Sequence, residues 1–236
     1  MKRKLIFFSV LVLCMGTATT AKSQVLLSLI FGDKLNNEDN LFGIHMDYSW
    51  NQLSGVEADK NMRTFNFGLF YTHKWDNNLH LNIEMLAKYQ RGAAGIPAYD
   101  LDDPRLNSIY ADTDVTRKIS YLSLPVTMRY AYKGAYFVEL GPQASFRTKA
   151  RDIFETELTQ GDASLDVDIR DQVQRIEMGY VTGIGMYIDK ERFNALGLRF
   201  QGGFSDVMKD IDGKQKNSQI AIYANLPIGR GKMKTK

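Results

Sequence analysis

The sequence predicts an all-β fold, an eight-stranded antiparallel transmembrane β-barrel with short periplasmic turns and long extracellular loops. Three observations lead to this prediction. Apolar and polar residues alternate with a period of two along most of the chain, the alternating runs are longer than the strands of soluble sheets, and short connections alternate with long ones. No run of eighteen apolar residues follows Gln24, so that part of the sequence contains no candidate for a spanning helix.

The first 23 residues have the pattern of a secretory signal peptide. A basic start, Met1 to Lys4, precedes an apolar core from Leu5 to Met15, and a run of small and polar residues ends in Ala21-Lys22-Ser23. This core has about half of the twenty apolar residues that an anchor helix needs. We therefore expect residues 1–23 to be removed on export.

Removal of this segment changes the charge of the protein. The whole chain has a formal net charge of +3, and residues 1–23 contain four basic residues and no acid, so the mature chain has a formal net charge of −1. This balance gives no reason to expect nucleic acid as a partner. The single cysteine, Cys14, is removed with the segment, so we expect a mature chain without disulfides.

Residues 24–40 are expected to form a periplasmic N-terminal segment. The apolar residues of Val25–Phe31 share one helical face, and Gly32 follows as a stop signal, which fits a short amphipathic helix. These apolar residues are Val25, Leu26, Leu29 and Ile30. A short edge-like β segment fits the same stretch, so both alternatives stay open.

The barrel itself is expected over residues 41–229, followed by a basic C-terminal tail over residues 230–236. Its eight strands are predicted at 42–50, 65–71, 79–89, 122–130, 136–146, 176–188, 196–204 and 220–228. Tight turns are expected near 76–78, 133–134 and 189–191, and the even strand number places both ends of the barrel on the periplasmic side. The longest connections, 91–115 and 149–173, are rich in acidic residues and are expected to be solvated, partly disordered loops.

One register of the alternation carries charged residues and is expected to face the lumen. The interior of an eight-stranded barrel is just wide enough for side chains, so acids and bases have to pair there. We therefore expect a closed, salt-bridged lumen with little room for a channel. The predicted polar network of the lumen consists of His45, Asp47, Glu84, Lys88, Arg129, Glu139, Arg147, Glu177 and Arg199.

Aromatic residues gather toward the strand ends and predict interfacial girdles. The predicted set is Tyr48, Trp50, Tyr71, Trp75, Tyr89, Tyr130, Tyr132 and Tyr136. Two prolines also fall inside predicted strands. Because Pro125 and Pro142 each remove one ladder donor, we expect a bulge or a local break in pairing near one of them.

The stretch YLSLPVTMRYAYKGAYFVELGPQASF, residues 121–146, resembles the middle of the PorT-like outer-membrane β-barrel family of the Bacteroidetes. In that family a Tyr-Leu-x-x-Pro strand, a Lys-Gly turn and an x-x-Gly-Pro-x strand recur. Residues 26–35, LLSLIFGDKL, resemble a stretch that many members carry before the first strand. The resemblance implies an outer-membrane barrel in a diderm bacterium and says little about activity, although a few members are linked to type IX secretion.

Location in the bacterial outer membrane implies several partners. We expect contact with outer-membrane lipid and lipopolysaccharide, and with the barrel assembly machinery. Such barrels commonly end on an aromatic residue that this machinery reads, whereas the present sequence ends in the basic tail, and Ile228 or Tyr223 is the candidate substitute.

No pattern in the sequence predicts an enzyme, a cofactor site or a metal site. His45, His73 and His80 are the candidate bases, but none is placed at the extracellular rim beside a nucleophile, so we interpret them as polar lumen and interface residues. The stretch Asp210-Ile211-Asp212-Gly213 lacks the rest of a calcium loop.

We therefore expect a monomer with a structural role, or one that binds a protein partner through its extracellular loops. Two alternatives stay open. One is an accessory component of type IX protein secretion, which rests on analogy with the family. The other is a narrow small-solute porin, which the charged lumen and the small strand number oppose.

Overall fold

The computed structural model describes residues 36–37, 39–158, 161–188, 194–209 and 214–228. The expected signal peptide, the Val25–Phe31 segment, the Asp210–Gly213 stretch and the basic tail lie outside the described residues. In the described part of the chain, no helix combines the length and the apolar character needed to cross a membrane.

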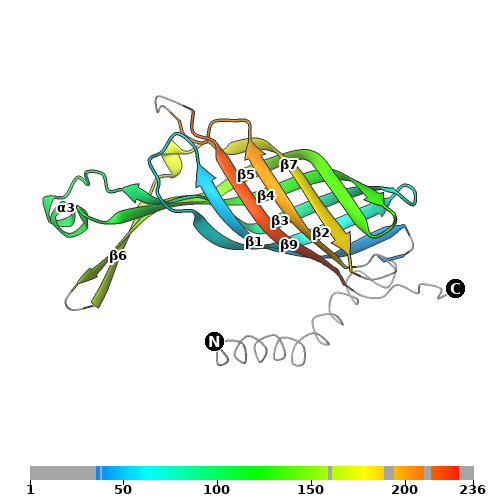
Figure 1. Cartoon of the computed structure of the whole chain (residues 1–236). Helices are drawn as coiled ribbons and strands as arrows, with labels where there is room; N and C mark the ends of the chain where they lie inside the picture. Colours follow the sequence, from blue (N-terminus) through cyan, green and yellow to red (C-terminus); the bar gives the residue numbers. More distant parts are fainter. Residues whose placement is uncertain (1–35, 38, 159–160, 189–193, 210–213, 229–236) are drawn as a thin grey trace, which may run out of the picture.

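Across the described residues, nine antiparallel strands form one sheet, and eight of them close into a ring (Figure 1). The strands of the ring are β1 (Asn40–Leu53), β2 (Met62–Lys74), β3 (Leu79–Pro97), β4 (Asp114–Tyr132), β5 (Tyr136–Leu158), β7 (Ile176–Tyr187), β8 (Ala195–Gly203) and β9 (Asn217–Pro227). β9 pairs with β1, so these eight strands leave no open edge in the ring, as a bilayer requires. The predicted eight-stranded barrel is confirmed.

The ninth strand belongs to a projection at the end of the barrel opposite the tight turns. β3, β4 and β5 run beyond the other strands, and β6 (Gly161–Asp168) pairs with β5 alone (Figure 1). Together with helix α3 (Pro104–Tyr110) and the 3-10 helix η1 (Arg170–Gln172), they form what we call the head, residues 91–120 and 148–175. The prediction of disordered loops at 91–115 and 149–173 was therefore wrong.

The head is ordered because it shares an apolar core with the adjoining end of the barrel. Period-two alternation continues through the acidic segments and turns Ile96, Val115 and Phe154 toward this core. The buried members of the core are Leu53, Leu86, Tyr89, Ala93, Ile96, Tyr110, Val115, Ile119, Tyr121, Ala150, Phe154, Ile169, Val173, Val207 and Met208. Asp103 caps α3 by accepting a hydrogen bond from the Arg105 N–H, and Pro104 follows as the first helical residue.

A bulge in β3 exchanges the inward-facing and outward-facing positions in the half of the strand nearer the head. β2 pairs Phe67 with Lys88 but Leu69 with Met85, so β3 contains one extra residue. Beyond the bulge Tyr89 is buried and Lys88 is exposed, with the Lys88 ammonium 5.8 Å from the ring centroid of Phe65. The prediction was wrong for both residues: Lys88 is not in the lumen network, and Tyr89 is not in a girdle.

Arg147 lies at the rim of the barrel, beside a second bulge, in β5. β4 pairs Ser120 with Lys149 but Tyr121 with Arg147, which leaves one extra residue in β5. Arg147 is half-buried near the rim, where its Nε donates to the carbonyl oxygen of Gln174 at 3.3 Å. Its predicted place in the lumen network was therefore wrong.

The expected irregularity at the prolines is confirmed. The β4–β5 ladder runs from the pair Pro125–Gln143 directly to Met128–Leu140, so pairing is interrupted opposite Pro142. The lost donor of a proline accounts for such a gap. Tyr223, one candidate for the assembly signal, is instead buried in the lumen.

Candidate functional site

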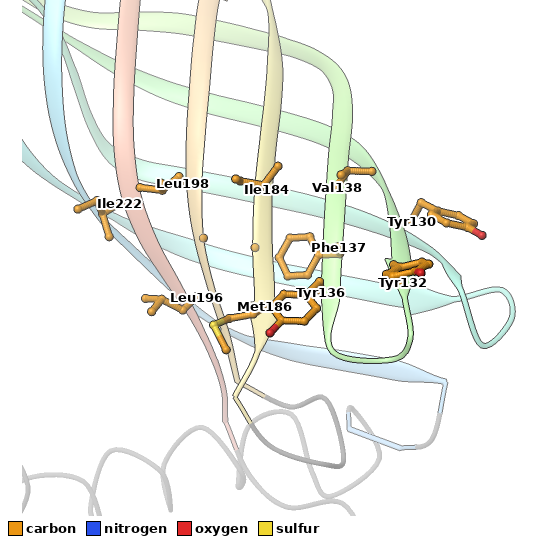
Figure 2. A pocket seen from close by; sticks show the side chains of 12 residues that line it. Tyr130, Tyr132, Tyr136, Phe137, Val138, Ile184, Met186, Leu196, Leu198 and Ile222 are labelled. Carbon is orange, nitrogen blue, oxygen red and sulfur yellow. The ribbon is translucent and has the colours of Figure 1, made fainter.

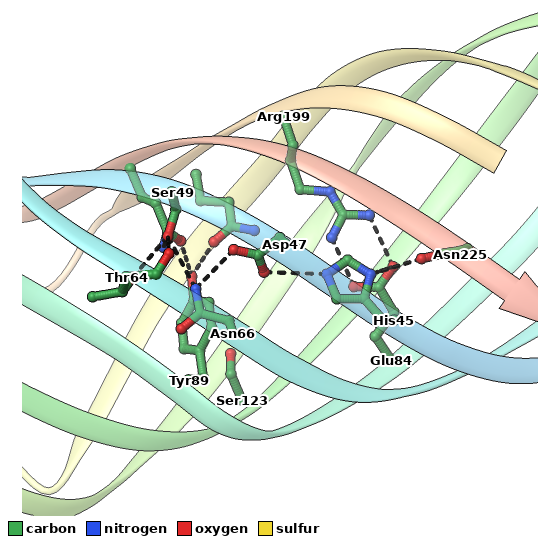
Figure 3. Close-up of polar contacts among 12 residues, drawn as sticks. His45, Asp47, Ser49, Thr64, Asn66, Glu84, Tyr89, Ser123, Arg199 and Asn225 are labelled. Atoms are coloured by element: carbon green, nitrogen blue, oxygen red, sulfur yellow. Dashed lines mark hydrogen bonds and ion pairs between the residues drawn. The ribbon is translucent and has the colours of Figure 1, made fainter. Parts of the chain in front are cut away.

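A layer of buried charges contributed by four strands crosses the lumen, and Figure 3 shows two of its members, Arg199 and Glu84. Arg199 on β8 donates to both carboxylate oxygens of Glu84 on β3, at 2.7 and 2.8 Å. Its Nε also donates to Glu139 on β5 at 2.8 Å, and Arg129 on β4 donates to the same carboxylate at 2.9 Å. All four side chains are almost fully buried, so the pairs cross-link the barrel from within.

His45 and Asp47 of β1 extend the charged layer to the strand that closes the ring. His45 Nε2 lies 3.2 Å from Asp47, and His45 Nδ1 lies 2.7 Å from the side-chain amide of Asn225 on β9. When the Asn225 amide is oriented so that its oxygen accepts from Arg129 at 3.1 Å, its nitrogen donates to His45. The histidine is thus held on both ring nitrogens, and its partners are structural groups without a nucleophile.

A second buried ion pair lies nearer the head. Arg91 Nη1 donates to Glu177 at 2.5 Å, Arg91 Nε donates to the Tyr89 hydroxyl at 2.9 Å, and Asn217 donates to the other oxygen of Glu177 at 2.8 Å. Uncharged hydroxyl and amide groups fill the space between the two charged layers. They include Ser49, Thr64, Asn66, Ser123, Gln143, Ser145, Gln201 and Gln219.

Apolar clusters close the lumen at both ends. At the periplasmic end the buried cluster consists of Ala131, Phe137, Tyr187, Ala195 and Tyr223. At the extracellular end the core of the head covers the barrel. Charged, polar and apolar layers therefore follow one another along the axis, and side chains fill the lumen as the strand number requires.

The structure brings together seven of the nine residues predicted for the lumen. His45, Asp47, Glu84, Arg129, Glu139, Glu177 and Arg199 are all buried inside the barrel, whereas Lys88 and Arg147 are not. Sequence reasoning missed Arg91, which was assigned to a loop. The bulge in β3 shifts Arg91 into the inward-facing register, which strict alternation could not have predicted.

The two other candidate histidines are also bound to structural partners. His80 is buried beside the Tyr187 hydroxyl at 2.9 Å, and His73 lies near Asn40 at 2.8 Å at the periplasmic end of β2. Among the residues that the structure describes, no three His, Cys, Asp or Glu side chains gather as a metal site.

A third buried ion pair stabilises the head. Arg117 on β4 donates to both oxygens of Asp152 on β5, at 2.9 and 2.7 Å. Burial of Tyr99, together with the charge of the neighbouring Asp152 carboxylate, raises the pKa of the Tyr99 phenol to about 12. The head is therefore held by side-chain pairs as well as by strand pairing.

The head also presents an open strand edge. β6 is the last strand of the sheet and pairs with β5 from Leu158–Gly161 to Arg151–Asp168. Its alternation turns Ala163, Leu165 and Val167 toward the core of the head, and turns Asp162, Asp166 and Asp168 to the opposite face. The unpaired edge of β6 is therefore accompanied by one apolar and one acidic row.

Comparisons with known proteins agree with this architecture. A family model described as outer membrane protein beta-barrel domain matches residues 39–209. No curated protein matches the sequence.

Several solved structures are similar to this chain at low sequence identity. Neisserial surface protein A is 12% identical, with a TM-score of 0.43, and the match covers 79% of this chain and 96% of that chain. Ail, the attachment invasion locus protein of Yersinia pestis, is 14% identical with a TM-score of 0.42 and the same coverage. OprG from Pseudomonas aeruginosa is 8% identical with a TM-score of 0.32, over 81% of this chain and 96% of that chain.

Proposed function

Because this chain belongs to the family of outer membrane protein β-barrel domains, we propose that it is a closed barrel of the bacterial outer membrane whose head binds a partner protein by strand addition. The open edge of β6 is the observation that carries the proposal. Side chains fill the lumen, so the barrel serves as a rigid base for the head. Accessory function in type IX secretion rests on the resemblance of residues 121–146 alone.

The chemistry of β6 favours a particular kind of partner segment. A free strand edge presents unpaired N–H and C=O groups, and an extended peptide can add to it as a further strand. The side chains of the added strand would lie beside those of β6 on each face. Apolar residues would continue the row of Ala163, Leu165 and Val167. Basic residues would face the acidic row, in which Asp166 already pairs with Arg151 and Asp168 with Arg170. We therefore infer an extended segment that alternates apolar and basic residues.

The test measures binding of a synthetic peptide of alternating valine and lysine to the full chain in uncharged detergent micelles, by fluorescence anisotropy. Neighbouring N–H groups of a strand point to opposite sides within the sheet. One of the two variants Leu165→Pro and Asp166→Pro therefore removes an N–H donor from the open edge of β6. We expect that variant to weaken binding at least about tenfold, which corresponds to about 1.4 kcal/mol.

The matched control is Asp112→Asn, which removes an acid from the turn after α3, a segment that does not pair with β6. We expect it to bind the peptide as the unaltered protein does. If both proline variants keep full affinity, or if Asp112→Asn weakens binding as much, the peptide is held by charge alone and strand addition is refuted.

A further inference from the structure

The outer wall of the barrel carries an apolar hollow at its periplasmic end (Figure 2). It has a volume of about 640 Å³, and its lining comes from β4, β5, β7, β8 and β9. Strand register aligns the outward side chains that border it into two rows. The upper row is Tyr130, Val138, Ile184, Leu198 and Ile222, and the lower row is Tyr132, Tyr136, Met186 and Leu196. The hollow is therefore a trough that crosses neighbouring strands.

The floor of the trough is bare backbone. Gly185 and Gly197 are paired directly between the two rows. On the lumen side, the Phe137 ring lies under Gly185, where an added Cβ would be 2.3 Å from Phe137 Cζ, and the Tyr223 ring lies under Gly197 at 2.5 Å. The trough is therefore sealed from the lumen and opens only to the lipid side.

The dimensions of the trough suit one hydrocarbon chain. Its two rows are two residues apart along each strand, which corresponds to about 7 Å, and its five strands span about 19 Å. A neighbouring hollow of about 380 Å³ instead has Glu139 in its lining. An acyl chain would avoid a carboxylate, so the glycine-floored trough is the better seat for it.

The rim of the trough offers the groups that a lipid phosphate needs. Lys133 lies in the β4–β5 turn with its ammonium 5.3 Å from the ring centroid of Tyr132, and the side chains of Tyr132 and Tyr136 are 57% and 59% exposed. Tight turns of an outer-membrane barrel lie on the periplasmic side, which places this rim at the inner leaflet. A cation and two phenols at that depth complement an anionic headgroup.

We propose that the trough binds one acyl chain of an anionic phospholipid of the periplasmic leaflet, whose phosphate is held by Lys133 and the hydroxyls of Tyr132 and Tyr136. A second copy of the chain is the competing occupant. Docking about a two-fold axis through the trough would bring two Lys133 side chains to the same rim, and this like-charge contact opposes it.

The test titrates the full chain in detergent with palmitoyl-oleoyl phosphatidylglycerol and counts bound lipid by native mass spectrometry. Val138→Trp fills the trough, and Lys133→Gln removes the cation from the rim. We expect each change to weaken retention of the first lipid about tenfold. Ile83→Trp adds the same bulk to an outward position of β3, outside the trough, and we expect it to leave retention unchanged.

Each other outcome overturns the proposal. If Val138→Trp retains the first lipid as well as the unaltered protein does, the trough is not the binding site. If Ile83→Trp loses as much lipid as Val138→Trp does, the lipid contact is unspecific. Folding of each variant is checked by the heat-dependent gel shift, and Leu196→Trp replaces Val138→Trp if the latter does not fold.

Cysteine cross-linking tests whether a second copy of the chain occupies the trough. Cys14 is the single cysteine of the sequence and lies in the expected signal peptide, so Leu198→Cys gives a single reactive site in the cleaved chain. Under oxidation in phospholipid vesicles, a disulfide-linked dimer contradicts the lipid proposal, and a monomer supports it.

Discussion

Glu84 illustrates how a carboxylate can be stabilised inside a membrane barrel. It accepts two hydrogen bonds from Arg199 and one from Asn82 at 2.8 Å, and His45 Nδ1 lies 3.5 Å away. Charges removed from water need this density of partners, because their mutual attraction has to offset the loss of hydration. We therefore expect Glu84 to be more sensitive to substitution than an exposed acid.

We predict that Glu84→Gln lowers the free energy of unfolding by about 3–5 kcal/mol, because it leaves the buried Arg199 with one carboxylate instead of two. Lys88→Gln, four residues further along β3, is the control and should change it by less than about 0.5 kcal/mol, because Lys88 is exposed. Urea unfolding in phospholipid vesicles measures both. Similar values for the two variants would contradict the assigned network.

A second prediction at this scale concerns Tyr99 in the head. Because its pKa is raised from 10.0 to about 12, the fold favours the neutral phenol. Its contribution to stability is fully present below pH 10 and is lost as the pH rises through about 12. Ultraviolet absorbance follows the formation of phenolate as the pH rises. The Tyr99→Phe variant should lack one ionisation step, and this missing step should lie near pH 12. A missing step near pH 10 would refute the contact with Asp152.

The residues of the lumen could be predicted only in strands where the alternation of apolar and polar residues is unbroken. Parity along β1, β4, β7 and β8 placed Asp47, Arg129, Glu177 and Arg199 inside, where the structure has them. The prediction failed for Lys88 because this residue follows a bulge, and a single extra residue exchanges the two faces of a strand. Arg147 keeps the inward parity of Ser145, but it lies at the rim, where its side chain donates to the Gln174 carbonyl instead of joining the network. No local residue type marks either bulge, so parity gave no warning.

At the scale of elements, the strands of the barrel were predictable and the head was not. Apolar alternation and glycine turns define the membrane strands. The segments at 114–120 and 150–156 also alternate, but their high charge favoured a reading as solvated loops. What orders them is the apolar core that they form together, and that core is a property of the tertiary fold. Only Asp103-Pro104, the start of α3, carried a local signal that sequence reasoning overlooked.

The β4–β5 turn yields a prediction at the element scale. Lys133 and Gly134 have φ angles of 47° and 70°, so both lie in the left-handed region. Gly134→Ala should lower the free energy of unfolding by about 1 kcal/mol, because a Cβ is disfavoured there. Gly134→Asn should cost less, since asparagine tolerates this conformation. Urea unfolding distinguishes them, and equal losses would argue against the turn geometry.

At the scale of the whole molecule, the barrel separates two tasks. Its wall meets lipid with an apolar surface, and its lumen is filled by alternating layers of charge, amide groups and aromatic rings. We therefore expect the head to stand on a base that does not transmit solutes, which is the arrangement that the proposed binding role requires.

We predict that the purified protein shows no discrete conductance steps in a planar bilayer, because apolar clusters close both ends of its lumen. A heat-dependent gel shift of the same sample verifies that the barrel is folded. Discrete steps from a folded sample would overturn the closed lumen and favour the small-solute porin instead.

The charged layer also constrains how the barrel can assemble. Its members come from β1, β3, β4, β5, β8 and β9, and the contact of His45 with Asn225 spans the seam where the first strand meets the last. Until that seam closes, an inserted sheet would expose arginines and carboxylates to hydrocarbon, at a cost of several kcal/mol for each ion. We therefore expect partly inserted intermediates to be unstable, and insertion and closure to proceed as one cooperative event while the inner face still contacts water.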